Sequence, residues 1–387
     1  MSRLERLTPL LESFVKNGPP GCACKVERAG KVLYERYVGL SDVATRRPVT
    51  PDLIYRFYSN SKPITCVAAL VLYERGAYQM NDPLSEYLPE FRDVRVYQTG
   101  PNGTLTAEPA KRSVRIRDLF TMTSGLCYPG DDVETARQVA VAQREMESRL
   151  GPAGYDVRTM SRTLAGIPLA FEPGTHWRYG LSHDVLGALI EVLSGKSLGR
   201  FLEEEIFTPL GMKDTSFRLP KEKAGRLCAM YDRSAEGALT RNDSWDAPYQ
   251  PDARFESGGG GLLSTVADYG RFGQMLAHDG ALQGTRILGG RTVQLMRTNH
   301  LNAEVLKDYN WEHMAGYGYG LGVRVMIDPA AQGSNGTIGE FGWGGLAGTW
   351  LLADAKEELS VVYAQQTMPN QEPIHQTLLR NVVYGGL

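Results

Sequence analysis

Strand-like segments lie near the two ends of the chain, and the long middle is mainly helix-like. Residues 20–42 alternate and are rich in β-formers, and the same character returns only at 316–327 and 349–366. Strands of one sheet must meet in space, so the ends of the chain are expected to form one discontinuous α/β domain. We predict an antiparallel sheet flanked by helices over 1–75 and 255–387, a mainly helical insertion over 76–254, and an active site at their interface.

Composition and charge exclude several classes of protein. The chain has 387 residues and a net charge of −2, which gives no reason to expect binding to nucleic acid or an anionic membrane. No apolar run approaches the ~20 residues of a membrane helix. The first 18 residues form an amphipathic pattern without the continuous apolar centre of a secretory signal. The five cysteines are scattered and odd in number, so we expect free thiols and a cytoplasmic protein.

The stretch YRFYSNSKPIT, from Tyr55 to Thr65, carries the first chemical signal. Pro63 and the apolar residues after it predict a helix that ends near Gly76 and begins around Ser59 to Lys62. Residues three apart share a helix face, so the Ser59 hydroxyl can meet the Lys62 amine near the positive end of the helix dipole. The pair suits a nucleophile and its base. An N-cap serine beside a surface lysine would give the same pattern.

Two further segments carry residues that chemistry could use. Tyr179 lies in a loop just before a strong amphipathic helix predicted over Ser182 to Ser194. A tyrosine in that position is more often a half-buried packing residue. Glycines 344, 345 and 348 surround Trp343 and Leu346 near a late strand and indicate close backbone contact. That contact suits either a crowded strand crossing or a ligand along the strand edge.

Signatures of other enzyme classes are absent from the sequence. There is no G-x-S-x-G nucleophile elbow, no H-E-x-x-H and no G-x-x-x-x-G-K-[ST] phosphate loop. The six histidines are dispersed. The glycine-rich segment 258–261 lacks the features of a dinucleotide fold, and we interpret it as a turn into a helix capped by Ser264 or Thr265. We therefore expect no metal and no cofactor.

Taken together and in order, these segments resemble the serine β-lactamase and penicillin-binding-protein superfamily, most of all the class C β-lactamase-like esterases called family VIII carboxylesterases. FTMTSGL at 120–126, PGTHWRYG before Tyr179, LSTVADYGRF and the closing WGG, strands and helix extend the resemblance over nearly the whole chain. It implies a β-lactamase/transpeptidase-like fold. It also implies an acylated serine at Ser59, proton transfer by Lys62 and Tyr179, and a site edge at Trp343, Gly344 and Gly345.

Two departures from the superfamily's pattern favour an esterase. β-Lactamases and penicillin-binding proteins usually carry K-T-G at the third motif, where this chain has Trp343-Gly344-Gly345. They carry Y-x-N at the second motif, where this chain has Leu181 in place of the amide. Both changes remove polar groups that would hold a β-lactam or a peptide terminus. The expected substrate is a small-molecule ester with a short or small acyl group, hydrolysed or passed to another alcohol.

The expected mechanism assigns further residues. Burial near the positive end of a helix is expected to lower the pKa of Lys62, so that a neutral amine accepts the Ser59 proton. The amides of Ser59 and Leu346 are expected to form the oxyanion hole. Candidates for the acyl pocket are the aromatic residues Tyr128, Trp245 and Tyr249. A β-lactamase, a D-amino-acid peptidase or amidase, and a non-catalytic ligand-binding relative remain alternatives. The sequence predicts neither the oligomeric state nor the natural substrate.

Overall fold

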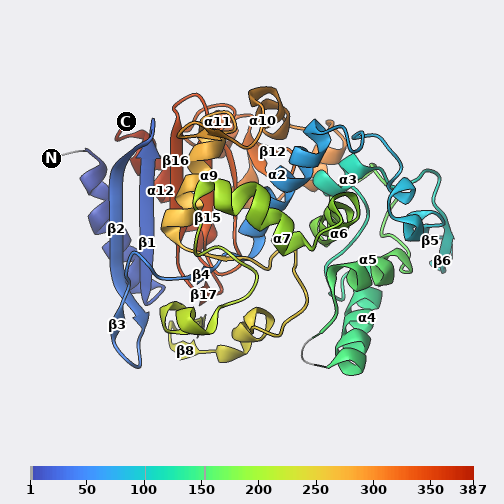
Figure 1. Cartoon of the computed structure of the whole chain (residues 1–387), viewed down its shortest axis with the longest axis horizontal. Coiled ribbons are helices and arrows are strands. Elements are labelled where there is room, and N and C mark those ends of the chain that lie inside the picture. Colours follow the sequence, from blue (N-terminus) through green and yellow to red (C-terminus); the bar gives the residue numbers. More distant parts are fainter. Residues whose placement is uncertain (1–2, 101, 152–153) are drawn as a thin grey trace.

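An eight-stranded antiparallel sheet joins the two ends of the chain in the computed structural model, which describes residues 3–100, 102–151 and 154–387 (Figure 1). The strand order is β12-β13-β14-β15-β16-β1-β2-β3. Ala23 of the first strand lies opposite Ala364 of β16, so an N-terminal strand pairs with a C-terminal one inside the sheet. The strands are β1 (Gly21–Arg28), β2 (Lys31–Asp42), β3 (Arg47–Pro48), β12 (Tyr317–Tyr319), β13 (Arg324–Met326), β14 (Phe341–Gly344), β15 (Trp350–Asp354) and β16 (Leu359–Ala364). This arrangement confirms the predicted α/β class.

Helices cover both faces of the sheet. Successive side chains of a strand point to opposite faces, so the buried side chains of β1 belong alternately to two hydrophobic clusters. Cys22, Cys24 and Val26 pack with α1 (Leu7–Asn17) and α12 (Glu372–Tyr384). Ala23 belongs to the larger cluster on the opposite face, which contains α2 (Ser61–Glu74) and α9 (Val266–Ala277). Helix α2 therefore lies on the side of the sheet that carries α9 and the helices from the middle of the chain.

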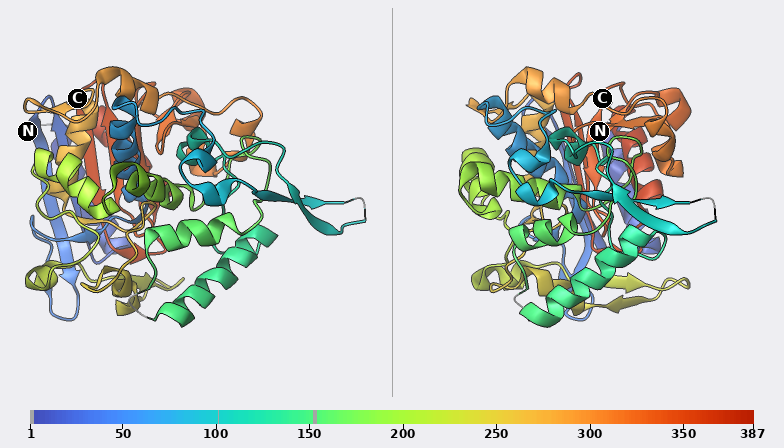
Figure 2. Two further views of the ribbon diagram at one scale, coloured as in Figure 1. Left: turned by 45° about the vertical axis from the view of Figure 1, so that its right-hand side comes forward. Right: turned by 90° about the vertical axis from the view of Figure 1, so that its right-hand side faces the viewer.

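The middle of the chain supplies a second layer of helices around α6 (Ser182–Ser194). α6 packs against α2 on one side and α5 on another, with α3 and α7 also in contact. Figure 2 shows a β-hairpin of β5 (Arg95–Thr99) and β6 (Leu105–Pro109) projecting from this part of the molecule. The other helices of this region are α3 (Ile116–Phe120), α4 (Glu134–Leu150), α5 (Val157–Ala165), α7 (Leu198–Leu202), a π-helical turn (Glu203–Phe207) and α8 (Thr208–Leu210).

Short elements complete the fold. Strands β7 and β8 form a small sheet with β17, a C-terminal strand that runs parallel to β7. These elements are β4 (Tyr55–Arg56), β5 (Arg95–Thr99), β6 (Leu105–Pro109), β7 (Tyr231–Arg233), β8 (Leu239–Arg241), β9 (Leu263–Ser264), β10 (Ala281–Leu282), β11 (Thr285–Arg286), β17 (Thr367–Met368), α10 (Gly290–Met296) and α11 (Pro329–Gln332). In the described part of the chain, no helix is both long and apolar enough to cross a membrane.

Two local predictions differ from the structure. The segment 316–327, predicted as strand throughout, is broken into β12 and β13, which pair with each other. The break falls at Gly322, whose φ of +77° favours glycine, and at Gly320, where a Cβ would lie 2.2 Å from the Met296 carbonyl oxygen. The region 76–254 also contains strands β5 to β8 besides its helices. The division into two domains with those boundaries stays a prediction.

Candidate active site

Ser59 lies in a 3₁₀ turn, Tyr58–Asn60, between β4 and the start of α2 at Ser61. The residue before it, Tyr58, has a φ of +44°. A bulky residue in the left-handed region is strained by about 1–3 kcal/mol and persists only where its surroundings fix it. The turn is fixed by the Phe57 amide, which donates to the Leu262 carbonyl at 2.9 Å. The predicted helix start is therefore correct within two residues, and the serine stands on a constrained turn.

Lys62 is fully buried, and its amine has three partners. Nζ lies 3.2 Å from the Ser59 hydroxyl oxygen, 2.9 Å from the Tyr128 hydroxyl and 2.6 Å from the Gly259 carbonyl oxygen. Three acceptors match the three hydrogens of an ammonium group. The interpretation of Lys62 as a surface lysine is therefore wrong.

Tyr179 completes the group around the amine. The Lys62 Nζ atom lies 4.5 Å from the centre of the Tyr179 ring and 5.4 Å from that of Tyr128. The Tyr179 hydroxyl accepts a hydrogen bond of 3.1 Å from the Trp343 indole N–H. The segments that carry Tyr128 and Tyr179 can pack together because residue 180 is glycine. A Cβ at this position would lie 2.2 Å from the Leu126 carbonyl oxygen and would keep the two segments apart. The structure thus brings Ser59, Lys62, Tyr128, Tyr179 and Trp343 together.

The pKa of Lys62 differs in direction from the one expected. Burial alone lowers this pKa, but the hydroxyl oxygens of Tyr128 and Tyr179 raise it, and the net pKa is above its usual value. Burial in turn raises the pKa of Tyr128 against the opposing effect of Lys62. The expectation of a lowered lysine pKa is therefore wrong: at neutral pH the resting site holds an ammonium group beside a neutral Tyr128 hydroxyl.

Two amide groups next to Ser59 are free to donate. Within the described residues, neither the Ser59 nor the Leu346 backbone N–H has a hydrogen-bond partner. Gly345 lies against the serine turn, since a Cβ there would be 2.5 Å from the Phe57 carbonyl oxygen. The Thr349 hydroxyl donates to that same carbonyl at 3.1 Å. These contacts hold the strand edge beside the serine, so two unpaired donors occur where an oxyanion hole was expected.

Packing accounts for the glycines of the third motif. A Cβ at Gly344 would lie 2.6 Å from the Glu372 carboxylate, and Gly348 has a φ of +93°. The crowded-crossing interpretation therefore applies to these glycines. The alternative interpretation, a ligand bound along the strand edge, now depends on the unpaired Leu346 amide alone.

The other two predicted pocket residues, Trp245 and Tyr249, lie in different surroundings. Trp245 contacts Tyr58 edge-on, with ring centres 6.0 Å apart. Tyr58 is the residue before Ser59, so Trp245 packs next to the serine turn. Tyr249 is buried in a small separate cluster with Ile54 and Leu263. The structure therefore does not place Tyr249 in the group around Lys62.

An aromatic cluster beside Tyr179 was missed by the sequence analysis. Trp311 contacts Tyr179 edge-on at 5.5 Å, contacts Trp343 at 6.4 Å and is 36% exposed. Trp177 and Tyr319 pack behind it. Trp311 comes from a long irregular segment whose sequence has no periodicity, so only the tertiary fold identifies it.

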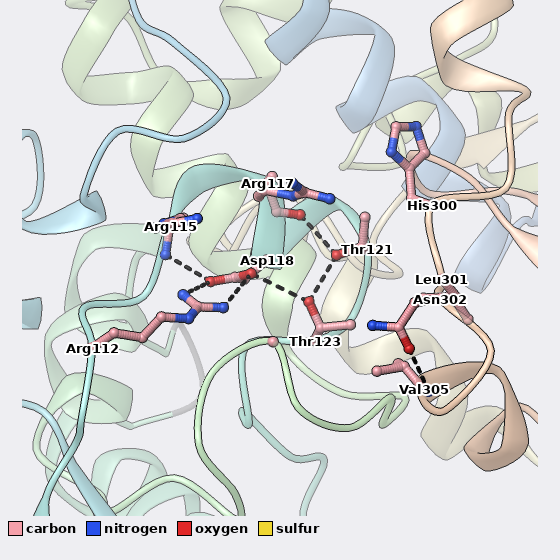
Figure 3. A pocket seen from close by; sticks show the side chains of 11 residues that line it. Arg112, Arg115, Arg117, Asp118, Thr121, Thr123, His300, Leu301, Asn302 and Val305 are labelled. Atoms are coloured by element: carbon pink, nitrogen blue, oxygen red, sulfur yellow. Dashed lines mark hydrogen bonds and ion pairs between the residues drawn. The ribbon is translucent and has the colours of Figure 1, made fainter.

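A small polar hollow of about 180 Å³ lies elsewhere, beside α3, and contains none of these residues (Figure 3). Its Asp118 carboxylate accepts from the Arg112 guanidinium at 2.7 and 3.1 Å and from the Arg115 amide at 2.8 Å. These bonds fix the start of α3, ahead of the turn that carries Tyr128. We assign this hollow a structural role.

The antiparallel sheet with flanking helices, and a helix that starts at Ser-x-x-Lys beside two tyrosines, define the class of serine β-lactamases and penicillin-binding proteins. A family model described as Beta-lactamase matches residues 7–383, so the chain belongs to the β-lactamase family. It is an enzyme of the β-lactamase-like hydrolase and acyltransferase group.

Curated relatives and solved structures extend this result. Esterase EstB of Burkholderia gladioli is 30% identical over 90% of this chain and 86% of its own length. Acyltransferase calJ of Penicillium decumbens is 27% identical over 89% and 83%. The simvastatin synthase LovD of Aspergillus terreus has the same fold, with a TM-score of 0.85 at 22% identity over 100% of this chain and 98% of that one. The hydrolase EstCE1 has a TM-score of 0.81 at 24% identity over 99% of both chains.

Proposed function

We propose that the protein is a serine carboxylesterase that forms an acyl ester on Ser59 and passes the acyl group to water or to another alcohol. The observation that carries the proposal is the geometry around Ser59: a buried Lys62 amine 3.2 Å from the hydroxyl, with unpaired amides on Ser59 and Leu346. A nucleophile, a proton acceptor and two oxyanion donors are the parts that acyl transfer requires.

In the first half-reaction the Ser59 hydroxyl oxygen attacks the ester carbonyl carbon. The serine proton moves to the coupled group of Lys62, Tyr128 and Tyr179, and the carbonyl oxygen becomes an oxyanion held by the Ser59 and Leu346 amides. The tetrahedral intermediate then breaks its bond to the alkoxide, which takes a proton from the same group. Water or an alcohol repeats these steps on the acyl-serine and regenerates the free enzyme.

The raised pKa of Lys62 decides which protonation state reacts. A protonated amine cannot accept the serine proton, so the reactive form is the one in which the coupled group has already lost one proton. Because several interacting hydroxyls and an amine share it, that loss has a single apparent pKa for the group. We therefore propose that the activity rises with pH above neutrality.

The residues around the site support an ester over a β-lactam or a D-amino-acid peptide. Trp343 offers an indole N–H that Tyr179 already uses, and no cation for a substrate carboxylate. Leu181 is buried in the main core cluster and offers no amide to the site. Relatives that are named esterases and acyltransferases give further support.

A substrate panel tests the proposal. Purified protein is assayed with p-nitrophenyl acetate and butyrate, nitrocefin and a D-alanyl p-nitroanilide, with and without a competing alcohol. Ester turnover together with a fluorophosphonate adduct at Ser59 supports the proposal. Preference for nitrocefin or the anilide favours a β-lactamase or peptidase, and a folded protein without turnover or adduct favours a non-catalytic ligand-binding protein.

We also propose a reducing, cytoplasmic location. Cys22, Cys24, Cys66, Cys127 and Cys228 are all buried free thiols. Buried thiols persist where disulfide exchange is unfavourable. Fractionation of the native host tests this, and recovery of the protein outside the cytoplasm would contradict it.

A further inference from the structure

Asp184 is a buried carboxylate close to Lys62 that the mechanism above does not use. It lies in the first turn of α6 and is 1% exposed. Its Oδ1 atom accepts from the Ser257 hydroxyl at 2.5 Å and from the Gly259 amide at 3.2 Å. Among the residues that the structure describes, its Oδ2 atom has no hydrogen-bond partner. Both partners of Oδ1 are donors, as a carboxylate oxygen requires.

Gly259 joins this carboxylate to the amine. Its N–H donates to Asp184, and its carbonyl oxygen accepts from Lys62 at 2.6 Å. A Cβ on Gly259 would lie 2.5 Å from Asp184 Oδ2, so glycine is needed for this approach. The Thr65 hydroxyl donates to the neighbouring Gly258 carbonyl at 2.8 Å. The glycine segment 258–261 is thus held between α6 and α2, with one end on the carboxylate and the other on the amine.

Asp184 is the carboxyl group among the titratable side chains around Lys62. The titratable groups that face the amine are Tyr128 and Tyr179 from their loops, His183 and Asp184 from α6, and Cys66 from α2. Burial and Lys62 hold the pKa of His183 well below its usual value, so this ring is neutral. Burial raises the pKa of the Cys66 thiol. Asp184 is the carboxyl group among them: burial raises its pKa, and the Ser257 hydroxyl, the Lys62 charge and the Gly259 amide oppose that rise.

We propose that Asp184 is a positioning residue for the Ser59 reaction. Through Gly259 it fixes the carbonyl that holds Lys62 toward Ser59, and its charge keeps the proton on the lysine in the resting enzyme. A buried ammonium without a counter-ion is strongly disfavoured, so removal of this charge makes deprotonation of Lys62 easier. This inference rests on the proposed function of Lys62.

The test compares two isosteric substitutions in the full-length protein. Asp184→Asn keeps an oxygen acceptor for Ser257 and Gly259 but removes the charge. Thr65→Val removes the hydrogen bond to Gly258, and so loosens the same glycine segment, without any change of charge. For each, kcat and kcat/KM for p-nitrophenyl butyrate are measured from pH 6 to about pH 10, and circular dichroism checks the fold.

Asp184→Asn should lower the limiting rate at high pH at least tenfold and move the midpoint of the pH–rate profile to lower pH by about one unit. One unit is the shift expected of a single charge about 12 Å away at an effective dielectric constant of about 20, so a nearer carboxylate should give at least that much. Thr65→Val should lower the rate less and leave the midpoint unchanged. A midpoint in Asp184→Asn equal to that of the wild type overturns the proposal, because a purely structural role changes the rate alone.

Two controls keep the outcome interpretable. Fluorophosphonate labelling of the wild type at Ser59 separates the two proposals: without that adduct the proposed function fails, and with it only the role of Asp184 is in question. If Asp184→Asn does not fold, Ser257→Ala replaces it. Loss of that donor should raise the pKa of the carboxyl, so more of it is neutral, and the midpoint of the pH–rate profile should move to lower pH, as in Asp184→Asn. An unchanged midpoint then overturns the proposal.

Discussion

Replacing Tyr128 by phenylalanine removes the hydroxyl that accepts from Lys62 at 2.9 Å and leaves the aromatic ring in place. A hydrogen bond to a charged group contributes about 1.5–3 kcal/mol when both partners are buried. If that bond holds the amine in its reactive position, its loss corresponds to a decrease of about 10- to 150-fold in kcat/KM, since 1.4 kcal/mol equals a factor of ten.

The same substitution has a consequence for pH. Tyr128 is the largest of the influences that raise the pKa of Lys62. Its removal should lower that pKa, and the rise of activity with pH should begin at a lower pH than in the wild type. The loss of rate should therefore be larger at high pH than near neutrality, where the easier deprotonation of Lys62 offsets part of it.

The assay is steady-state hydrolysis of p-nitrophenyl butyrate between pH 6 and about pH 10. Tyr55→Phe is the matched control, because the Tyr55 hydroxyl is buried in β4 and has no hydrogen-bond partner within the described part of the chain. That control should remain within about twofold of the wild type at every pH. If Tyr128→Phe behaves like Tyr55→Phe in both rate and pH profile, the reasoning about the Lys62 group is refuted.

Three further predictions address the nucleophile, the base and the substrate. Ser59→Ala should abolish hydrolysis and the fluorophosphonate adduct seen by intact-mass spectrometry, and an adduct on Ser61 instead would contradict the assignment. Lys62→Arg should not restore the activity lost in Lys62→Ala, on the order of 10²–10⁴-fold, because a guanidinium stays protonated; near-normal kcat with an unchanged pH profile would make Lys62 only an electrostatic support. Aryl-ester hydrolysis should far exceed nitrocefin hydrolysis, and comparable kcat/KM values would refute the argument from Trp343 and Leu181.

Local spacing was enough to predict the elements that carry the site. The contact between Ser59 and Lys62 follows from three-residue spacing at a helix start, and the helix predicted over Ser182 to Ser194 has those bounds in the structure. The Thr265 cap was one of two alternatives, and its hydroxyl does accept from the Asp268 amide. In each case the deciding interaction lies within a few residues, where sequence patterns are informative.

Features that depend on distant contacts could not be predicted. Tyr128 reaches Lys62 because Gly180 packs against the Leu126 carbonyl, and nothing in either segment alone indicates this. The glycines at 258–260 form the predicted turn, but the sequence did not show that their carbonyls and an amide also connect α2 to α6. The pKa of Lys62 was predicted in the wrong direction, because burial could be inferred from the helix but the two tyrosine hydroxyls could not.

Trp343 links substrate preference to the proton path. Its indole N–H donates to the Tyr179 hydroxyl, so that hydroxyl keeps its own proton free to donate elsewhere, and the ring of Tyr179 stays 4.5 Å from the Lys62 amine. A lysine at position 343 would place a second cation near Lys62 and would make deprotonation of either amine easier. The WGG motif therefore leaves this edge of the site without a lysine for a substrate carboxylate, and it places an aromatic ring against Tyr179 instead. The missing lysine is the physical basis of the proposed preference for an uncharged ester over an anionic β-lactam.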